Sequence, residues 1–328
     1  MTRSLTRHLA LATAFIVWVL ITWGGIVHST GSSLACPDWP LCFSELFPEM
    51  KGHVAIEHGH RMLATLVGFL TIVLTVLLWT NRRSAKKKEQ TQGFTLHRLG
   101  FFALFLVIFQ GVLGGLTVIY HLPLLVSSAH LATSLLFLSI ILWIAFESKG
   151  EQLKDSIKRD LSAPYAWSAL AVLLIYLQMI VGALVRHTGS GMACGTDVIL
   201  CDGQLWPAWA PARLHMLHRF TAVLVSLVVL ISASNILWSL KKQPKIKALQ
   251  RFAWMQFALL ALQITLGISN VKYALNLHSV SAHLSVGTLL LANSVWIFLW
   301  LRALRQAATP STIRPESFPM PHTAKVVS

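Results

Sequence analysis

The chain has 328 residues, of which 55% are hydrophobic and only 12% are Asp, Glu, Lys or Arg. That charged share is about half of what a typical soluble domain carries. A soluble globule and a nucleic-acid enzyme are therefore excluded as first interpretations, despite a formal net charge of +15. About 180 apolar residues would supply roughly eight segments of about 20 residues, the length that crosses a hydrocarbon core about 30 Å thick. We expect an integral membrane protein.

Eight apolar segments, each long enough to cross a membrane, follow one another along the chain. We expect each to be a helix, because a backbone exposed to lipid must satisfy its own hydrogen bonds. The first exceeds the roughly 7–15-residue apolar core of a signal peptide and is interpreted as a retained helix. The segments lie near residues 8–28, 61–80, 99–119, 125–146, 166–186, 219–239, 252–271 and 279–301.

The basic residues indicate which side of the membrane each connection faces. Of the 27 Lys and Arg residues, 21 lie before the first segment, after the last, or in the connections that follow the second, fourth and sixth. The positive-inside rule therefore places both termini in the cytoplasm. Residues 306–328 contain four prolines among Ser and Thr, and we expect them to form a disordered cytoplasmic tail.

The chain contains an internal repeat. Residues 30–36 (TGSSLAC) recur as residues 188–194 (TGSGMAC), an offset of 158 residues. The same offset carries His60 onto His218. Two unrelated motifs that share one offset indicate that the chain consists of two related halves.

A second pair of histidines defines the extent of the halves. An offset of 153 residues carries His130 onto His283 within a Ser-Ala-His-Leu motif. Each half contains four segments and begins in the cytoplasm, so the repeat is parallel rather than inverted. We predict an all-α integral membrane fold of two four-helix bundles side by side, formed by residues 1–150 and 151–305.

The four histidines of the repeat lie at matched depth. His60 and His218 open the second helix of each half, and His130 and His283 lie near the start of the fourth. Two imidazoles that face each other across a four-helix bundle are suited to hold a haem iron from both sides. Most other histidines are assigned to the solvated interface; those near the segments are His28, His53, His58, His97, His121, His187, His215 and His278.

Other roles for these histidines are less favoured. A single histidine in a membrane helix most often forms a hydrogen bond to another helix. Four that obey the repeat argue for function, because polar groups at membrane depth are costly. A zinc ion would require four ligands, whereas each half offers two well-matched ones.

An acid accompanies only one of the two histidine pairs. Glu57 lies three residues before His60 and shares its face if the helix begins early enough, whereas the equivalent residue in the second half is His215. This difference suggests that one site performs acid–base or charge-stabilising chemistry and the other binds and transfers electrons. The alternative is a surface carboxylate paired with Arg61. Arg61 and Arg219 either contact haem propionates or anchor the helices at the headgroups.

All four cysteines lie in outer connections. Cys36 and Cys42 share the first, and Cys194 and Cys201 share the third. Their position on the oxidising side favours one disulfide in each loop, and each such loop would form a lid over the adjacent site. A redox-active pair is the alternative, although the spacings differ from Cys-x-x-Cys.

Taken together, these motifs resemble those of the haem A synthase family over about 290 residues. The resemblance rests on their order and topology rather than on any one motif. The residues that carry it are Gly31–Cys42, Glu57-x-x-His60-Arg61, Gln110–Val118, Gln178–Arg186, His215-Met216-x-His218-Arg219, His130-Leu131 and His283-Leu284.

The resemblance implies an oxidoreductase of a bacterial plasma membrane that acts on a CH group. It would oxidise a methyl substituent of haem O to a formyl group by successive hydroxylations, with water as the oxygen source. Similarity assigns a haem b cofactor to His218 and His283, the haem O substrate to His60 and His130, and the catalytic acid to Glu57. Haem O synthase, a protohaem farnesyltransferase, is the expected donor of the substrate.

The sequence leaves two other functions open: a non-enzymatic di-haem electron carrier and a quinone-linked thiol oxidant. A transporter is disfavoured, because no matched pair of broken helices marks a site at mid-membrane. The lipid bilayer is an expected partner, nucleic acid is not, and homo-oligomerisation stays open. No motif identifies the electron acceptor.

Overall fold

The computed structural model describes residues 2–83, 90–148, 160–241 and 246–308. Within these ranges the protein is helical, apart from its loops and two isolated antiparallel bridges. All eight α-helices are long and apolar enough to span a membrane, which confirms the predicted fold class. They are α1 (Thr2–Ser29), α2 (Gly52–Arg83), α3 (Gln90–Ile119), α4 (Leu124–Glu147), α5 (Ser162–His187), α6 (Ala210–Leu240), α7 (Lys247–Lys272) and α8 (Leu277–Ala308), with a short 3-10 helix, η1 (Ser190–Met192), after α5.

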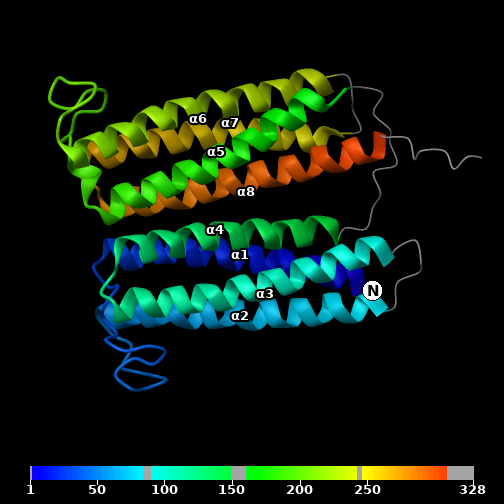
Figure 1. Ribbon diagram of the computed structural model, residues 1–328, viewed down its shortest axis with the longest axis horizontal. Helices are drawn as coiled ribbons and strands as arrows, with labels where there is room; N and C mark the ends of the chain where they lie inside the picture. The colour runs from blue at the N-terminus through cyan, green and yellow to red at the C-terminus, as the bar shows by residue number, and fades with distance from the viewer. Residues whose placement is uncertain (1, 84–89, 149–159, 242–245, 309–328) are drawn as a thin grey trace, which may run out of the picture.

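The helices form two rings of four (Figure 1). In the first bundle α1 contacts α2, α2 contacts α3, α3 contacts α4, and α4 closes the ring on α1; α5–α8 repeat this pattern. The bundles meet where α1 and α4 pack against α8, and α4 against α5. One apolar core runs through both, from Leu74 and Ile141 to Val229 and Leu291.

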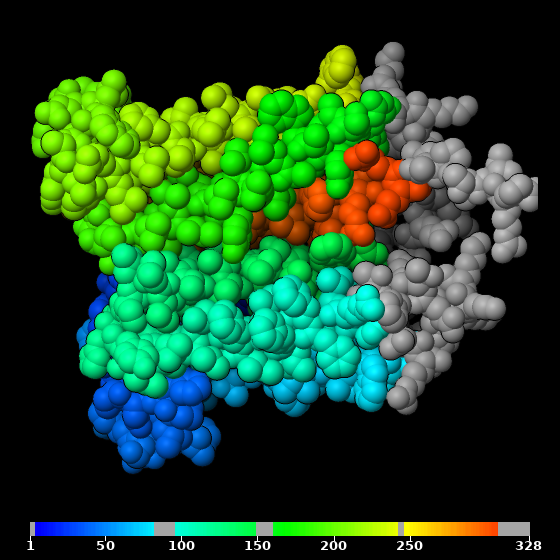
Figure 2. All heavy atoms as spheres, viewed as in Figure 1, coloured from blue at the N-terminus to red at the C-terminus, as the bar shows by residue number. Residues whose placement is uncertain are grey.

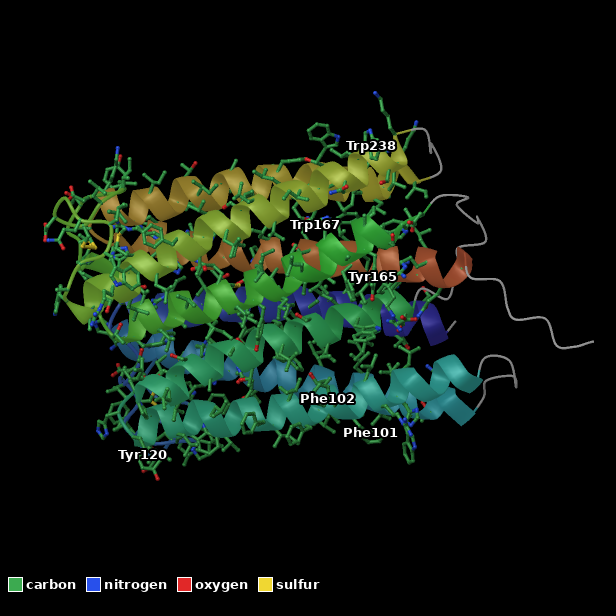
Figure 3. All side chains as sticks on the ribbon, turned by 45° about the horizontal axis from the view of Figure 1, so that its top comes forward. Phe101, Phe102, Tyr120, Tyr165, Trp167 and Trp238 are labelled. Atoms are coloured by element: carbon green, nitrogen blue, oxygen red, sulfur yellow. A yellow bond between two sulfur atoms is a disulfide. The ribbon has the colours of Figure 1, made fainter. Side chains whose placement is uncertain are left out.

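The outer faces of the bundles are apolar, as a helix surface in contact with lipid tails must be. Aromatic side chains such as Phe101, Phe102 and Trp238 point away from the helices (Figure 3). Trp238 is 77% exposed and Phe101 49%. Side chains that a soluble protein would bury are thus left to the bilayer.

Several helices begin earlier than the apolar segments predict; α3, for example, begins at Gln90 rather than at residue 99. The early starts of α2 and α6 bear on the predicted histidines. The second segment was expected from residue 61 and the sixth from residue 219, but α2 begins at Gly52 and α6 at Ala210. Their first turns are polar, so hydropathy alone does not detect them. The prediction that His60 and His218 open their helices was therefore wrong, because both lie two turns inside them.

Helix α8 ends later than expected. It continues to Ala308, so residues 306–308 of the predicted tail are helical. The remainder of that tail, residues 309–328, lies outside the described residues.

The first and third outer connections, here called the first and second outer loops (residues 30–51 and 188–209), emerge at one end of the helices. Figure 2 shows them as separate lobes, one beside each bundle. The N-terminus of α1 and the C-terminus of α8 lie at the opposite end (Figure 1).

Candidate active site

Each histidine of the repeat fits against a glycine on the preceding helix. A Cβ atom at any of these glycines would come 3.2–3.3 Å from the histidine Cε1 atom, closer than ordinary van der Waals contact. The glycines obey the same two offsets as the histidines, a signal that the sequence contains but that histidine spacing alone does not reveal. The pairs are Gly24 with His60, Gly114 with His130, Gly182 with His218, and Gly267 with His283.

The structure brings the predicted histidine pairs together. His60 lies within electrostatic range of His130, and His218 within range of His283. The Nδ1 atoms of His60, His130 and His283 are buried without a hydrogen-bond partner among the described residues. A buried polar atom without a partner costs about 1–3 kcal/mol, which indicates a site shaped for a ligand. In each bundle the two imidazoles match the ligands that a haem iron takes.

Glutamines distinguish the second bundle from the first. Gln178 Nε2 lies 3.0 Å from His218 Nδ1, and Gln263 Nε2 lies 3.3 Å from His283 Nε2. In the first bundle Gln110 donates to the backbone oxygen of His130 at 2.8 Å. Gln110 and Gln178 belong to motifs of the sequence, but their contacts to the histidines were not predicted, and Gln263 was not among the predicted site residues.

Glu57 is buried and holds the first outer loop. Its exposed fraction is 4%, so it is not the surface carboxylate of the alternative interpretation. Oε2 accepts the backbone N–H of Cys36 at 2.8 Å, and Oε1 pairs with Arg61 Nη2 at 2.6 Å. Because α2 begins at Gly52, Glu57 and His60 lie on the same helical turn.

Arg61 also binds the first outer loop. Its Nη1 atom donates to the backbone oxygens of Asp38 and Leu41, and its Nη2 atom donates to that of Cys36 as well as to Glu57. The guanidinium thus joins α2 to the loop at three backbone oxygens and to Glu57 on its own helix. Contact between Arg61 and a propionate stays a prediction.

The equivalent positions in the second bundle are arranged differently. Among the described residues, Arg219 donates to the second loop at the oxygen of Leu200, at 3.2 Å, and it has a further contact to Met216 Sδ of its own helix. Its Nη2 atom is buried without a partner in the described part of the chain. His215, which replaces the acid, is 4% exposed. Arg219 therefore keeps a guanidinium nitrogen available for an anionic group such as a propionate.

Both predicted disulfides are present. Cys36 is bonded to Cys42, and Cys194 to Cys201. In the first loop, the Trp39 ring packs on Gly115 of α3, where a Cβ would come within 2.7 Å of the indole. The first outer loop thus reaches from α2, where Arg61 holds it, to α3, next to the glycine that contacts His130.

A tight turn follows the first disulfide. Phe43 and Ser44 have φ angles of 55° and 62°, in the left-handed region. Both oxygens of Asp38 accept their backbone N–H groups, each at 2.7 Å. The N–H groups of Ser44, and then of Phe43, hold the pKa of the Asp38 carboxyl below its usual value. In the second loop, Asp202 and Gly203 occupy the equivalent turn.

One group of described residues has the compactness of a metal site but not its chemistry. Possible ligand atoms of Cys36, Cys42 and His58 lie within 4.8 Å of one another. The two sulfurs are joined in a disulfide and supply no thiolate. His58 Nε2 is 3.0 Å from the backbone oxygen of Leu46.

The assignment of most remaining histidines to the solvated interface was wrong in part. His58, His97 and His215 are buried, with exposed fractions of 4–6%. The error arose because α2, α3 and α6 extend beyond their apolar segments and bury polar residues in their terminal turns.

A cluster at the interface between the bundles was also missed. Arg186 of α5 donates to the oxygen of Gly25 at 2.8 Å, to Ser29 Oγ at 2.5 Å and to His28 Nδ1 at 3.2 Å, all on α1. The rings of His28 and His187 meet edge to face at 4.9 Å. The sequence signal for this cluster was Arg186, a charged residue at the end of the apolar segment 166–186.

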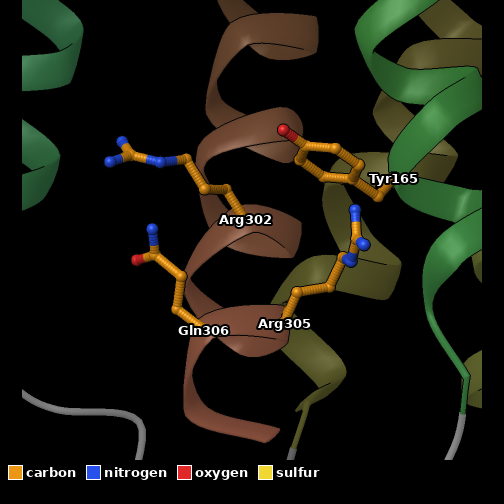
Figure 4. A pocket seen from close by; sticks show the side chains of 4 residues that line it. All are labelled: Tyr165, Arg302, Arg305 and Gln306. Atoms are coloured by element: carbon orange, nitrogen blue, oxygen red, sulfur yellow. The ribbon is translucent and has the colours of Figure 1, made fainter. Parts of the chain in front are cut away.

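A surface pocket lies far from these sites. Tyr165, Arg302, Arg305 and Gln306 line it (Figure 4). Tyr165 is near the start of α5 and the other three are near the end of α8, so the pocket is at the end opposite the outer loops. It contains none of the predicted site residues.

Comparison with known proteins agrees with this geometry. The COX15-CtaA family model, described as a cytochrome oxidase assembly protein, matches residues 47–295. The chain belongs to this family. A curated relative from Symbiobacterium thermophilum named "Heme A synthase" is 31% identical over 269 residues, covering 80% of this chain and 84% of that protein.

Further relatives carry the same name. The protein from Shouchella clausii is 30% identical over 246 residues, with 72% of this chain and 76% of that protein covered. The protein from Alkalihalophilus pseudofirmus is 27% identical over 266 residues, with 80% and 86% covered. The similarity thus extends over most of both the chain and its relatives.

Proposed function

We propose that this protein is a haem A synthase, an oxidoreductase that converts a methyl substituent of haem O into the formyl group of haem A. In each bundle two histidines pack against a glycine of the preceding helix, and we call each such histidine–glycine contact a histidine seat. The observation that carries the proposal is this pair of seats in each bundle, with a buried carboxylate beside one pair only. Family membership and relatives named "Heme A synthase" over most of their length support it.

The two bundles are proposed to have different tasks. In the second, formed by residues 151–305, His218 and His283 would hold a resident haem b, with Arg219 Nη2 toward a propionate. In the first, formed by residues 1–150, His60 and His130 would receive haem O. The glutamine contacts to the ring nitrogens of the second pair, and Glu57 beside the first, support this division. The resident haem would supply one-electron transfer.

Glu57 would act on the reacting carbon of the substrate. Its carboxylate is fixed by Arg61 and by the Cys36 N–H, and only two of its roughly four lone-pair positions are used. The remaining positions can orient a water molecule or stabilise positive charge as it develops, without reorganisation at the moment of reaction. Conversion of methyl to formyl with oxygen from water releases four electrons and four protons.

We infer that the outer loops face the extracytoplasmic side, with both termini in the cytoplasm, because 21 of the 27 basic residues lie on the side of the termini. The haem sites would then lie toward the outer face of a bacterial plasma membrane. Haem O would reach the first bundle from a haem O synthase, a membrane farnesyltransferase.

Two other functions have an observation in their favour. The similar histidine seats of both bundles suit a di-haem electron carrier. His58 beside the first disulfide suits a quinone-linked thiol oxidant. Neither accounts for a buried carboxylate that is present beside one histidine pair and replaced by histidine beside the other.

The experiment supplies purified protein with haem O and follows haem A by pigment extraction and mass spectrometry. We expect wild type to form haem A and Glu57→Gln to form it at least about ten-fold more slowly, with unchanged haem b content. Glu49→Gln, which alters an exposed acid paired with Lys51, is the matched control and should react like wild type.

Each alternative predicts a different outcome. Retention of both haems without conversion by wild type would indicate the carrier and overturn the proposal. Wild-type conversion by Glu57→Gln would remove the role of Glu57. Full activity after replacement of all four cysteines by serine would exclude the thiol oxidant.

A further inference from the structure

The four histidine seats differ in how the preceding helix contacts the imidazole. In three of them a glutamine stands four residues before the seat glycine, which is one helical turn. In the fourth, the equivalent residue is Leu20 of α1. The glutamines are Gln110, Gln178 and Gln263, and each follows the offset of its glycine.

In the second bundle both glutamines reach the imidazole itself. Gln178 Nε2 lies 3.0 Å from His218 Nδ1 and also donates to the His218 backbone oxygen. Gln263 Nε2 lies 3.3 Å from His283 Nε2. The amide oxygens of both glutamines are buried without a partner among the described residues. Gln263 can therefore turn and present its oxygen to the ring, whereas Gln178 would give up its hydrogen bond to the His218 backbone oxygen if its amide turned.

That freedom matters when an imidazole binds iron. The nitrogen that does not bind the metal carries the proton, and it needs an acceptor that fixes the orientation of the ring. A glutamine amide turned by 180° offers such an oxygen. In the second bundle an amide group already lies at one ring nitrogen of each histidine, Nδ1 of His218 and Nε2 of His283, which leaves His218 Nε2 and His283 Nδ1 for the iron.

In the first bundle, by contrast, the amide beside His130 is engaged elsewhere. Gln110 donates to the His130 backbone oxygen, and its own oxygen accepts a hydrogen bond from Thr133. The residue equivalent to Thr133 in the second half is Val286, which cannot donate. Thr133 thus holds the Gln110 oxygen away from the ring.

The seat of His60 contains no glutamine. Leu20 precedes Gly24 by one turn on the same face of α1, and the tether to α2 comes instead from Trp23, whose Nε1 donates to the Ile56 oxygen at 2.9 Å. Within the described ranges, the helices are held together here without a polar contact to the imidazole. His60 Nδ1 is buried and unpartnered in the described part of the chain.

We propose that the ring-facing glutamines, Gln178 and Gln263, are positioning residues that make the two histidines of the second bundle permanent haem ligands. In the first bundle, Leu20 and the Thr133–Gln110 pair give the rings of His60 and His130 no such support, so these histidines can release their haem. A substrate site must let its product leave, whereas a cofactor site must retain its haem. This inference rests on the proposed function, because it assigns a mechanism of retention and release to its two sites.

The test measures haem release from purified, haem-loaded protein to excess apomyoglobin, together with the low-spin EPR spectrum of the haem that remains. Wild type should release haem in a fast phase from the first bundle and a slow phase from the second. Gln178→Met keeps the side-chain volume and should accelerate the slow phase about ten-fold or more, with shifted EPR g-values.

Gln110→Met is the matched control for this variant. It removes the same bond to a backbone oxygen but no contact to a ring. We expect it to leave the slow phase unchanged. An equal acceleration of the slow phase by Gln110→Met and Gln178→Met would overturn the inference, as would a slow phase that Gln178→Met does not alter.

A second set of variants adds contacts instead of removing them. Leu20→Gln should slow the fast phase about ten-fold, whereas Leu20→Met, of similar size, should not. Val286→Thr introduces the hydroxyl that would engage Gln263 and should accelerate the slow phase. If Leu20→Gln and Leu20→Met release haem equally fast, the assignment of Leu20 is wrong.

Haem O conversion, measured in the same preparations, separates this inference from the proposed function. Conversion by wild type with haem release that is insensitive to the glutamines would overturn the inference alone. Glutamine-dependent release without conversion by wild type would overturn the function and leave the retention mechanism standing.

Discussion

The two bundles share one scaffold but use the charges at their outer ends differently. In the first, Glu57 and Arg61 form a buried pair that holds the disulfide loop at several points. In the second, His215 and Arg219 occupy the same positions, and Arg219 makes one loop contact and keeps Nη2 unpartnered. Duplication preserved the histidine seats and the flanking arginine, whereas the difference between Glu57 and His215 changed what surrounds them.

The largest difference is expected from removal of the two arginines. Arg61→Met would leave the Glu57 carboxylate buried without its cation and free three loop oxygens, and should destabilise the protein by about 3 kcal/mol or more. Arg219→Met loses one long hydrogen bond and should cost about 1 kcal/mol. Thermal unfolding of both variants in the same detergent measures the contrast.

Equal losses of stability in Arg61→Met and Arg219→Met would contradict this difference between the bundles. Limited proteolysis supplies a second measure, since cleavage between residues 36 and 51 should increase only in Arg61→Met. A change in haem b retention confined to Arg219→Met would support its contact with a propionate.

A smaller effect is expected at the glycine seats. In Gly182→Ala, the new methyl group would lie 3.2 Å from His218 Cε1 and displace the ring by a few tenths of an ångström. We expect haem b affinity to fall about ten-fold, as measured by haem titration of apoprotein. Gly111→Ala is the control, because a Cβ there meets no atom within 4 Å. Equal haem b affinities in Gly182→Ala and Gly111→Ala would show that the close contact between Gly182 and His218 does not position the ring.

The smallest effect concerns the pH dependence of the turn after Cys42. The N–H groups of Ser44 and Phe43 lower the pKa of Asp38, so its contribution to stability is present above the pKa of the unfolded chain. It is lost as the pH falls through the lower pKa of the folded state. Amide exchange at Ser44 should therefore stay slow at pH 5 and accelerate at lower pH, with intrinsic exchange corrected for.

A variant of Asp38 sharpens the comparison between the two loops. Asp38→Asn should abolish the pH dependence of exchange in the first turn, while the turn at Asp202 and Gly203 should be unaffected. Retention of the pH dependence in Asp38→Asn would show that another group controls it.

The sequence predicts the helices and the histidines well for a physical reason. A membrane-spanning segment must be apolar along about 20 residues, so hydropathy finds all eight helices. It fails at helix ends, where polar turns such as Gly52–His60 continue a helix without an apolar signal. The two-fold repeat then identifies His60 and His218 as equivalent without any knowledge of their contacts.

The partners of each site residue were harder to predict. The surface location of the alternative interpretation was wrong for Glu57, which is buried and accepts the Cys36 backbone N–H, while its catalytic role stays a prediction. That contact joins a helix to a loop 21 residues away, and helix periodicity contains no information about it. The glycine seats were within reach of the sequence, because Gly24 and Gly182 obey the repeat, but their meaning required the ring positions.

The division of labour between the bundles is the central claim, and haem analysis of His60→Ala and His218→Ala tests it most directly. Reduced-minus-oxidised spectra and pigment extraction are applied to both purified variants. The account predicts that His218→Ala loses the resident haem b and that His60→Ala keeps it but no longer converts haem O. Loss of haem b from His60→Ala with retention in His218→Ala would contradict the account.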